Sequence, residues 1–460
     1  MDALRSLPRV DAVAAHAALD DARRRLGAPR VMDVARRAVD DARARVIAGA
    51  ACPTLDEVAA DAARAASSGP LAARARRVIN ATGVVLHTNL GRAPLGADAL
   101  AALAASAGGY TSIEIDLDTG RRGARGAFAE RALAELTAAE AALVVNNNAA
   151  ATLLALTAIV AGAPAAARRV IVSRGELVEI GGGFRVPDVC ARSGAELVEV
   201  GTTNKTRLDD YARALDAGGV AAILRVHPGN FRQTGFVERP RLAELAALSR
   251  ARGVPLVKDL GGGALVDLAP LGLAGEPLAR ASVEAGCDLV CFSCDKVLGG
   301  PQGGAIVGRA ALVERARKDP LARAVRLGRL PLVALEATLA AMLEGRLDDV
   351  PALRMLRSTA DELRARAEAW TAALAALGVE ARVVELTSAV GGGALAEAEL
   401  PSFGVALEAP DVDALAARLR GGNPPVVGRI HAGALLLDAR TVQPGEDAAL
   451  LGALAAAHRG

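Results

Sequence analysis

The chain has 460 residues, of which 52% are hydrophobic and 23% are charged, so it can form two or three domains and is not disordered throughout. A net charge of +2 excludes a strongly basic nucleic-acid-binding protein as a description of the whole chain. The first residues show no signal-peptide pattern, and five cysteines do not suggest a disulfide framework. These features predict a protein of the reducing cytoplasm.

The first 66 residues predict a separate helical unit. Seven apolar residues fall on one helical face: Val31, Val34, Ala35, Ala38, Val39, Ala42 and Val46. Thr54 and Glu57 have the spacing of a capping box, in which two side chains satisfy free backbone N–H groups at a helix start. A Ser-Ser-Gly-Pro sequence then interrupts the pattern, so residues 67–78 are expected to form a linker.

Arginine is concentrated in this first part of the chain. Residues 1–77 contain 14 arginines and 10 acidic residues, a local charge of +4. Such an excess suits contact with a polyanion such as RNA, although a solvated arginine-rich face is the simpler interpretation from composition alone. The whole chain has one Trp, two Tyr and six Phe, so RNA recognition would depend on shape and phosphates rather than on base stacking.

From residue 79 onward, short β-branched runs alternate with longer Ala/Leu-rich stretches. This alternation predicts a mostly parallel sheet with helices on both faces, whose ligand lies at the carboxyl ends of the strands. The predicted strands are residues 143–145, 170–172, 197–200, 222–226, 256–257, 289–292 and 305–307. Later strand-like pieces at 404–407 and 435–437 suggest a smaller C-terminal α+β domain.

The longest stretch without charge, residues 141–167, is expected to contain a buried helix. It includes three asparagines and a proline, which a membrane-spanning helix would not tolerate well. The sequence therefore predicts no membrane association.

The first predicted strand is followed by residues that suit a phosphate group. Asn147, Asn148 and Ala149 come directly after it and begin a helix. Small residues at a helix start leave backbone N–H groups free for an anion. Taken singly, the same sequence also fits a capped buried helix.

An acid and a lysine follow two later strands. Asp259 ends one strand, and Ser293 and Lys296 end the next, before a glycine-rich loop. Such an acid can pair with a protonated ring nitrogen, or it can cap the next turn. A phosphate cradle, an acid of this kind and a lysine amine recur in enzymes that use pyridoxal phosphate, so the sequence predicts this cofactor.

Lys296 is the strongest candidate among only four lysines. It lies between a buried strand and a glycine-rich loop, where desolvation and nearby cations lower the pKa of an amine. Lys258 adjoins Asp259, and neighbouring residues on a strand face opposite sides. Lys205 and Lys318 lie in polar segments and are expected to be solvated.

Cys287, Cys291 and Cys294 have a C-x3-C-x2-C spacing that also occurs in loops that bind iron–sulfur clusters. Here the intervening residues have the composition of a buried strand, on which Cys291 and Cys294 would face opposite sides. No His/Cys cluster elsewhere accompanies them, so the sequence predicts no metal site.

Taken together, the motifs closely resemble those of the bacterial selenocysteine synthase family, the L-seryl-tRNA(Sec) selenium transferases. The resemblance covers essentially the whole chain, and it is specific because seven separate segments carry it. These segments are residues 7–11, 79–92, 146–151, 173–182, 201–206, 292–296 and 428–430.

The resemblance implies an α/β protein, a fold-type I pyridoxal-phosphate enzyme. Its large cofactor domain would span residues 79–335 and its C-terminal small domain residues 336–460, after the N-terminal unit. Lys296 would hold the cofactor covalently, and Asp259 would face the ring nitrogen. Four arginines match the phosphate-handling arginines of the family: Arg92, Arg125, Arg323 and Arg326. The alternative is that they are ordinary surface arginines.

The implied reaction converts L-seryl-tRNA(Sec) to L-selenocysteinyl-tRNA(Sec) with selenophosphate, through a dehydroalanyl intermediate. Lys296 would act as the general base, and the arginines would bind the polyanionic selenium donor. The resemblance also implies a large ring-shaped homo-oligomer, a decamer.

Two other interpretations stay open from the sequence. A related pyridoxal-phosphate lyase acting on a free amino acid or an amino sugar phosphate would use the same Lys296 and Asp259 but would not need residues 1–66. A non-catalytic RNA-binding protein would not need the lysine, the acid and the phosphate cradle together.

Overall fold

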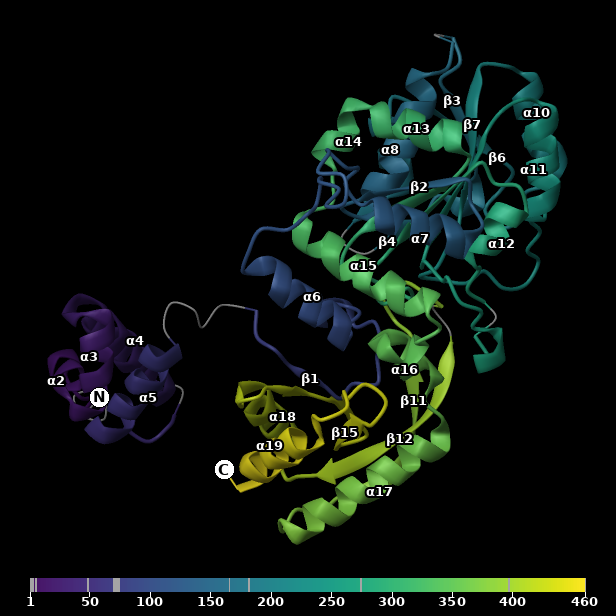
Figure 1. The fold of residues 1–460 in the computed structure, drawn as a ribbon. Coiled ribbons are helices and arrows are strands. Elements are labelled where there is room, and N and C mark those ends of the chain that lie inside the picture. Colours follow the sequence, from purple (N-terminus) through teal and green to yellow (C-terminus); the bar gives the residue numbers. More distant parts are fainter. Residues whose placement is uncertain are drawn as a thin grey trace. The chain divides into compact units, whose positions relative to one another are not determined.

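The computed structural model describes residues 4, 6–47, 49–68, 75–164, 166–180, 183–273, 275–395 and 398–459. The chain divides into two compact units, Met1–Arg77 and Val78–Gly460 (Figure 1). Residues 69–74 of the predicted linker, and residues 181–182 of one recognised motif, lie outside the described residues.

The first unit is made of helices that enclose their own small core. Its elements are α2 (Val10–Ala15), η1 (Ala17–Leu19), α3 (Asp20–Leu26), α4 (Ala28–Ile47) and α5 (Leu55–Ser68). The predicted apolar face belongs to α4, where Val31, Ala35 and Val39 are buried. The capping box at the start of α5 is confirmed: the Thr54 N–H donates to Glu57 Oε2 at 2.7 Å, and the Glu57 N–H donates to Thr54 Oγ1 at 3.3 Å.

Many arginines of this unit are paired with aspartates three residues earlier on the same helix. The N–O distances are 2.6, 3.1 and 2.6 Å for Arg23–Asp20, Arg36–Asp33 and Arg43–Asp40. Exposed pairs of this spacing contribute only about 0.2–0.5 kcal/mol each. Their main effect is on the surface charge of the unit, because positive and negative side chains alternate along the helices.

The second unit is built on a seven-stranded sheet of order β2-β10-β9-β8-β7-β3-β6. The strands are β2 (Ala141–Val145), β3 (Arg169–Ser173), β6 (Glu196–Val200), β7 (Val220–Val226), β8 (Leu256–Gly261), β9 (Leu289–Ser293) and β10 (Gly304–Gly308). β10 is antiparallel to β2 and β9, and the other pairs are parallel. All seven predicted strands are present, and the predicted mostly parallel sheet is confirmed.

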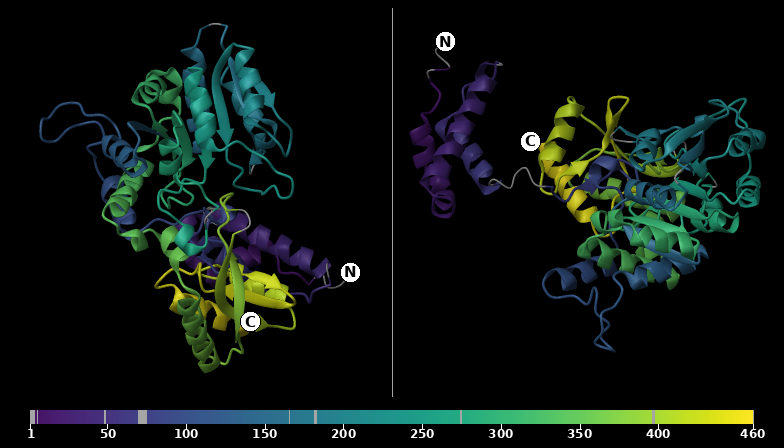
Figure 2. Two further views of the ribbon diagram at one scale, coloured as in Figure 1. Left: turned by 90° about the vertical axis from the view of Figure 1, so that its right-hand side faces the viewer. Right: turned by 90° about the horizontal axis from the view of Figure 1, so that it is seen from above.

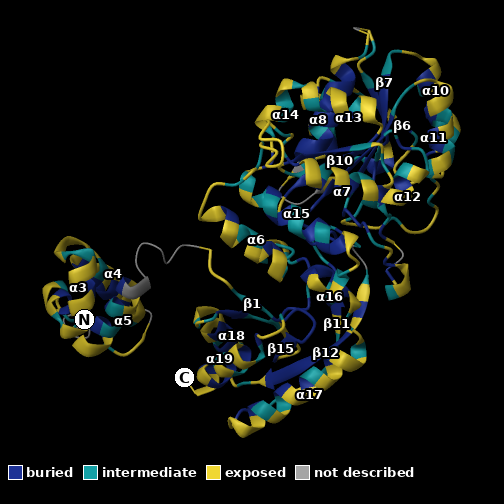
Figure 3. Ribbon diagram, in the orientation of Figure 1, coloured by how far each residue is buried: buried dark blue, intermediate teal, exposed yellow. Residues whose placement is uncertain are grey.

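Helices cover both faces of this sheet. One face packs against α8 (Asn148–Ala161), α9 (Val186–Arg192) and α13 (Ala310–Lys318). The other packs against α7 (Ala127–Thr137), α10 (Leu208–Asp216), α11 (Leu242–Ala251), α12 (Ala279–Glu284) and α15 (Arg329–Leu343). Apart from the edge strand β6, the strands are largely buried on both sides (Figure 3), which explains why they appear in the sequence as mainly apolar runs.

A second, four-stranded antiparallel sheet follows, of order β11-β12-β15-β14. It comprises β11 (Arg382–Ala389), β12 (Glu399–Glu408), β14 (Arg429–His431) and β15 (Ala434–Asp438), with helices α16 (Pro351–Arg357), α17 (Ala360–Ala376), α18 (Val412–Gly421) and α19 (Asp447–Arg459). The predicted strand pieces lie in β12 and β15. The expected domain boundary at residue 335 falls within α15, and the division of this unit stays a prediction.

Shorter elements complete the second unit. They are β1 (Ile79–Asn80), η3 (Thr88–Leu90), α6 (Ala97–Ala107), η4 (Arg174–Glu176), β4 (Glu179–Ile180), β5 (Phe184–Arg185), η5 (Ala269–Leu271), α14 (Pro320–Ala324), η6 (Leu347–Asp349) and β13 (Val426–Val427). β1 pairs in parallel with β13, so the start of this unit is joined to its C-terminal part. No helix in the described part of the chain is long and apolar enough to cross a bilayer.

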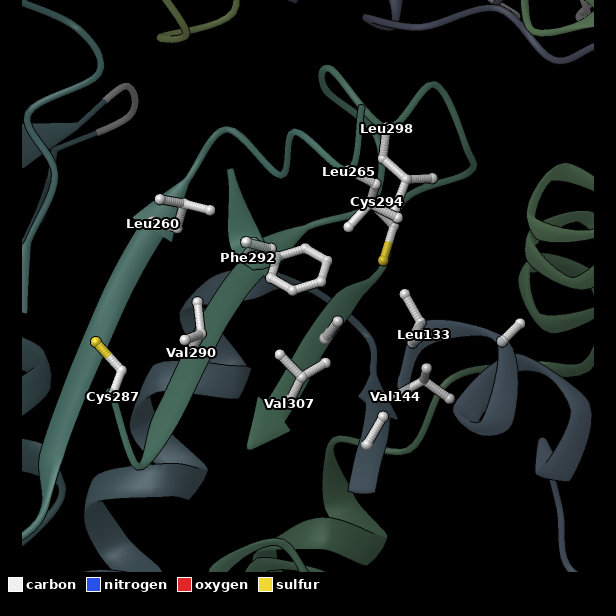
Figure 4. Close-up of a cluster of buried hydrophobic side chains, with 14 of the residues drawn as sticks. Leu133, Val144, Leu260, Leu265, Cys287, Val290, Phe292, Cys294, Leu298 and Val307 are labelled. Atoms are coloured by element: carbon white, nitrogen blue, oxygen red, sulfur yellow. The ribbon is translucent and has the colours of Figure 1, made fainter. Parts of the chain in front are cut away.

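The three clustered cysteines belong to the core. Cys287 and Cys294 lie with Val290 and Phe292 in the apolar cluster on one face of the sheet (Figure 4). Cys291 lies in the cluster on the other face, so the predicted opposite orientation of Cys291 and Cys294 is confirmed. Burial raises the pKa of the Cys287 thiol to about 12. Among the described residues, no group of three or more His, Cys, Asp or Glu side chains has the arrangement of a metal site.

Candidate active site

Asp259 lies at the carboxyl end of β8, where two polar side chains of α8 reach it. Asn148 Nδ2 donates to Oδ1 at 2.8 Å, and Thr152 Oγ1 donates to Oδ2 at 3.2 Å. Asn148 and Thr152 are one helical turn apart and therefore share a face. Burial raises the pKa of Asp259, while the Asn148 bond, the charge of Lys296 and the Thr152 bond oppose that change. A cationic partner would stabilise this carboxylate.

Lys296 is buried in the turn that follows β9, with only 6% of its surface exposed. The next residue, Val297, donates its N–H to the Gly262 carbonyl at 3.1 Å, which ties this turn to the end of β8. Burial lowers the pKa of Lys296, and Arg92 adds to this effect. An amine of this kind is neutral more often than an ordinary lysine, and so is a better nucleophile and base.

The other three lysines are placed differently. Lys258 Nζ donates to Ser282 Oγ on α12 at 3.0 Å, on the face opposite to Asp259, as predicted. Lys318 is exposed, as predicted. Lys205 is only partly exposed, and its amine lies 5.9 Å from the centre of the Phe236 ring. Lys296 is therefore the lysine whose charge acts on the Asp259 carboxylate.

The start of α8 is shaped by a cap and by close packing. Asn147 is its N-cap, and its side chain accepts the Ala150 N–H at 2.8 Å. A Cβ atom on Gly304 of β10 would lie 2.2 Å from the Asn147 carbonyl oxygen, so a glycine is required for this approach. Ala149, in the first turn, adds only a methyl group to this helix start. The capped-helix interpretation and the phosphate-cradle interpretation are therefore compatible.

The donor set of this site fits pyridoxal phosphate. It combines a buried amine, a buried carboxylate bound on both oxygens and a helix start with small residues. Asn148 Oδ1 is buried and has no hydrogen-bond partner within the described residues. Ser293, the last residue of β9, is also buried at this edge, although no described contact gives its hydroxyl group a role.

Arg92 is joined to the residue before the lysine. Its Nη1 lies 2.6 Å from Asp295 Oδ2, and a third of its side chain is exposed. Its backbone has a φ of 64°, after η3 and Gly91, and this unusual conformation turns the chain sharply at that point. The sequence reasoning missed Asp295, although its position directly before Lys296 was a usable signal.

The other three matching arginines form a separate group. Arg125 Nη1 and Arg326 Nη1 lie 3.4 and 3.2 Å from the same atom, Glu114 Oε1. Both line a cavity of about 380 Å³ together with the exposed Arg323. The backbone of Arg326 bridges to Val145, the last residue of β2, so this group lies near the strand that leads to α8. The structure thus brings three predicted arginines together and places Arg92 with Asp295.

Comparison with known protein families agrees with this geometry. Residues 78–443 match a family described as L-seryl-tRNA selenium transferase, and residues 4–43 match one described as selenocysteine synthase N terminal. The chain belongs to the L-seryl-tRNA selenium transferase family. The resemblance recognised in the sequence motifs is therefore confirmed.

Three relatives of this protein can be aligned with it over nearly its whole length. The L-seryl-tRNA(Sec) selenium transferase of Hyphomonas neptunium is 44% identical over 451 residues, which are 96% of each chain. The one of Moorella thermoacetica is 46% identical over 466 residues, 99% of this chain and 97% of the other. The one of Geobacter sulfurreducens is 44% identical over 464 residues, 97% of this chain and 98% of the other.

A solved structure shares the fold of this family member. D-glucosaminate-6-phosphate ammonia-lyase superimposes with a TM-score of 0.57 at 23% identity, covering 84% of this chain and 96% of the lyase. At this level of identity the likeness concerns the fold alone, and it agrees with the predicted fold class.

Proposed function

We propose that this protein converts L-seryl-tRNA(Sec) to L-selenocysteinyl-tRNA(Sec), with selenophosphate as the selenium donor and pyridoxal phosphate as the cofactor. The family match over residues 78–443 carries the proposal. The arrangement of Lys296, Asp259 and Asn148 at one edge of the sheet supports it.

The residues of the site suit the proposed chemistry. Pyridoxal phosphate, when bound, withdraws electrons from the Cα of an amino-acid substrate and so makes its Cα proton acidic. Asn148 and Thr152 fix the Asp259 carboxylate, which would face the ring nitrogen. Lys296 would hold the cofactor, and its Nζ, once free, would take up the Cα proton. The first turn of α8, with Asn147, Asn148 and Ala149, would bind the phosphate group.

The arginines suit the selenium donor. A planar guanidinium group offers paired donors to a phosphate-like oxyanion, whereas a second free amine near Lys296 would compete for the cofactor. Arg92 is held by Asp295 beside the lysine, and it is the nearest candidate for the reacting group. Arg125, Arg323 and Arg326 line a separate cavity and would guide the anion or the end of the tRNA.

The small-molecule lyase interpretation is not favoured. The relatives named as transferases match this chain from end to end, including its N-terminal helices. A lyase that acts on a free amino acid or an amino sugar phosphate has no need of that unit. The non-catalytic interpretation is also weaker, because the lysine, the acid and the helix start lie together.

A direct assay tests the proposed function. Purified protein loaded with pyridoxal phosphate is incubated with seryl-tRNA(Sec) and selenophosphate, and the amino acid released from the tRNA is identified by mass spectrometry. Selenocysteine is the expected product, and serine carried by a different tRNA should remain serine. Conversion of free serine or of an amino sugar phosphate at a comparable rate would contradict the proposal.

The N-terminal unit is proposed to contact the tRNA. The apolar core of this unit is formed by its own residues, so deletion of residues 1–66 should leave the absorption spectrum of the bound cofactor unchanged. The tRNA affinity is expected to fall roughly 10–100-fold, and each lost phosphate contact should lower the log–log salt slope by somewhat less than about one. Because many arginines here are paired with aspartates, we expect few strong contacts. Undiminished affinity in filter binding would remove this role.

We further propose a cytoplasmic location and a ring-shaped homo-oligomer. Use of a tRNA and five free cysteines suit the cytoplasm. The loop between α6 and α7 exposes Tyr110, Ile115 and Leu117 and extends from the body of the second unit (Figure 2), as expected for a segment that a second copy covers. Light scattering of the full-length protein and of the 1–66 deletion separates an assembly role of the N-terminal unit from an RNA role.

A further inference from the structure

A buried carboxyl group near the lysine is not explained by the site described above. The Glu276 side chain is completely buried, and neither of its oxygens has a hydrogen-bond partner within the described residues. Burying a polar group without a partner is costly, so such a group usually has a task. Glu276 precedes α12 and comes from a segment that neither the sequence motifs nor the proposed function uses.

The backbone is shaped to admit this carboxyl group. A Cβ atom on Gly262 would lie 1.7 Å from Glu276 Oε1, so a side chain at this position would displace the carboxyl group. The segment is fixed because Ala279 donates its N–H to the Ala264 carbonyl at 3.0 Å. The Gly262 carbonyl in turn accepts the N–H of Val297, the residue after the lysine. One turn after β8 therefore holds both Glu276 and the Lys296 segment.

The charged and titratable groups around Glu276 come from three strands. His227, after β7, places Nε2 3.9 Å from Glu276 Oε2, which is too long for a hydrogen bond. The positive charges of Lys258 on β8 and Lys296 after β9 lower the pKa of Glu276, and so does the Leu395 backbone amide. Burial lowers the pKa of His227 to about 4, so this ring is neutral at neutral pH.

Burial brings the pKa values of the acid and the amine closer together. Burial raises the pKa of Glu276 to about 7, against the opposing effects of Lys296, the Leu395 amide and Lys258. Burial lowers the pKa of Lys296, with Arg92 in the same direction and Asp259, Asp295 and Glu276 opposed. Both changes narrow the gap between the two pKa values. Exchange of a proton between these groups therefore costs less free energy than between an ordinary exposed glutamate and lysine.

We propose that Glu276 is the proton partner of Lys296: its carboxylate, seated against Gly262, takes the proton that the lysine ammonium gives up and returns it later. An N–H bond breaks on Lys296 and an O–H bond forms on Glu276, so one positive and one negative charge disappear together. Glu276 acts through Lys296 and is therefore a positioning residue. This inference rests on the proposed role of Lys296.

The test measures the charge state of Lys296 in the full-length protein freed of cofactor. Acetic anhydride acetylates only neutral amines, so the rate of Lys296 acetylation, followed by peptide mass spectrometry across pH, has its midpoint at the pKa of the amine. Glu276→Gln removes a negative charge that favours the ammonium form. The midpoint is therefore expected to fall by about one pH unit or more. An unchanged midpoint would overturn the proposal.

Two variants serve as controls. Glu276→Asp keeps the charge and should keep the midpoint close to that of the unaltered protein. Glu336→Gln removes another half-buried carboxyl group, on α15, whose pKa is raised by burial but which is not among the charges that act on Lys296. Its midpoint should not move, and an equal shift in Glu336→Gln would also contradict the proposal.

A second measurement applies if Glu276→Gln does not fold. Protein with ¹³C-labelled glutamate is titrated by infrared spectroscopy, which separates glutamate carboxyl bands from those of aspartate. A glutamate band that titrates near neutral pH is expected, and Lys296→Met should raise the midpoint of that band because a positive charge is lost. The absence of such a shift would refute the pairing. Neither measurement uses tRNA or a selenium donor, so failure here is distinct from failure of the conversion assay.

Discussion

Replacing Lys296 with alanine is expected to abolish the covalent attachment of pyridoxal phosphate. Borohydride reduces the bond between a lysine amine and the cofactor aldehyde, so cofactor should remain on the Lys296 peptide of the unaltered protein and on no peptide of the variant. Selenocysteinyl-tRNA formation should fall by at least about 1,000-fold, the scale on which removal of a covalent catalytic group acts.

The matched control is Lys258→Ala. Lys258 is equally buried, but its amine contacts Ser282 on the opposite face of the sheet. This variant should lose some stability and still trap cofactor at Lys296. Thermal unfolding of both variants checks that the fold persists. Cofactor trapped on Lys258, Lys205 or Lys318 in the Lys296 variant would show that the wrong lysine has been assigned.

Much of this site was predictable because the sheet imposes simple rules. Each β-branched run became a strand, and the polar residues after the runs therefore met at the carboxyl edge. Alternation along β8 correctly placed Lys258 and Asp259 on opposite faces. The N-terminal helices were equally predictable from the sequence, since an apolar face and a capping box are local patterns.

Other parts depend on contacts between distant segments. Glu114 meets Arg326 across 212 residues of sequence, and no local pattern indicates that pair. The burial of Glu276 likewise depends on a glycine in a different segment. Thr152 is an intermediate case. Its spacing of four from Asn148 is a local pattern that puts both on one helical face, but its bond to Asp259 joins residues 107 positions apart.

The grouping of the arginines changes what their replacement should do. From sequence, Arg92, Arg323 and Arg326 are expected to contribute alike to binding of the selenium donor. In the structure, only Arg92 is held beside Lys296, whereas Arg323 and Arg326 are exposed at a separate cavity. We therefore expect unequal effects, with the largest at Arg92.

Replacing Arg92 with alanine is expected to weaken use of selenophosphate about 30-fold. This corresponds to about 2 kcal/mol, the low end for truncation of one member of a charge pair, because a third of the side chain is exposed. Arg323→Ala should have a smaller effect, and Arg122→Ala, outside the cavity, should have none. The apparent selenophosphate affinity at saturating seryl-tRNA(Sec) measures all three.

The decisive comparison is between the two halves of the reaction. Loss of the seryl hydroxyl group, measured without donor as serine that can no longer be recovered from the tRNA, should persist in Arg92→Ala. Arg92 also lowers the pKa of Lys296, so its removal should shift that first half toward higher pH, and both halves must be compared across pH. If the donor step is weakened at every pH while the first half recovers at high pH, Arg92 binds the donor. Equal loss of both halves at all pH values would mean instead that the Arg92–Asp295 pair builds the pocket.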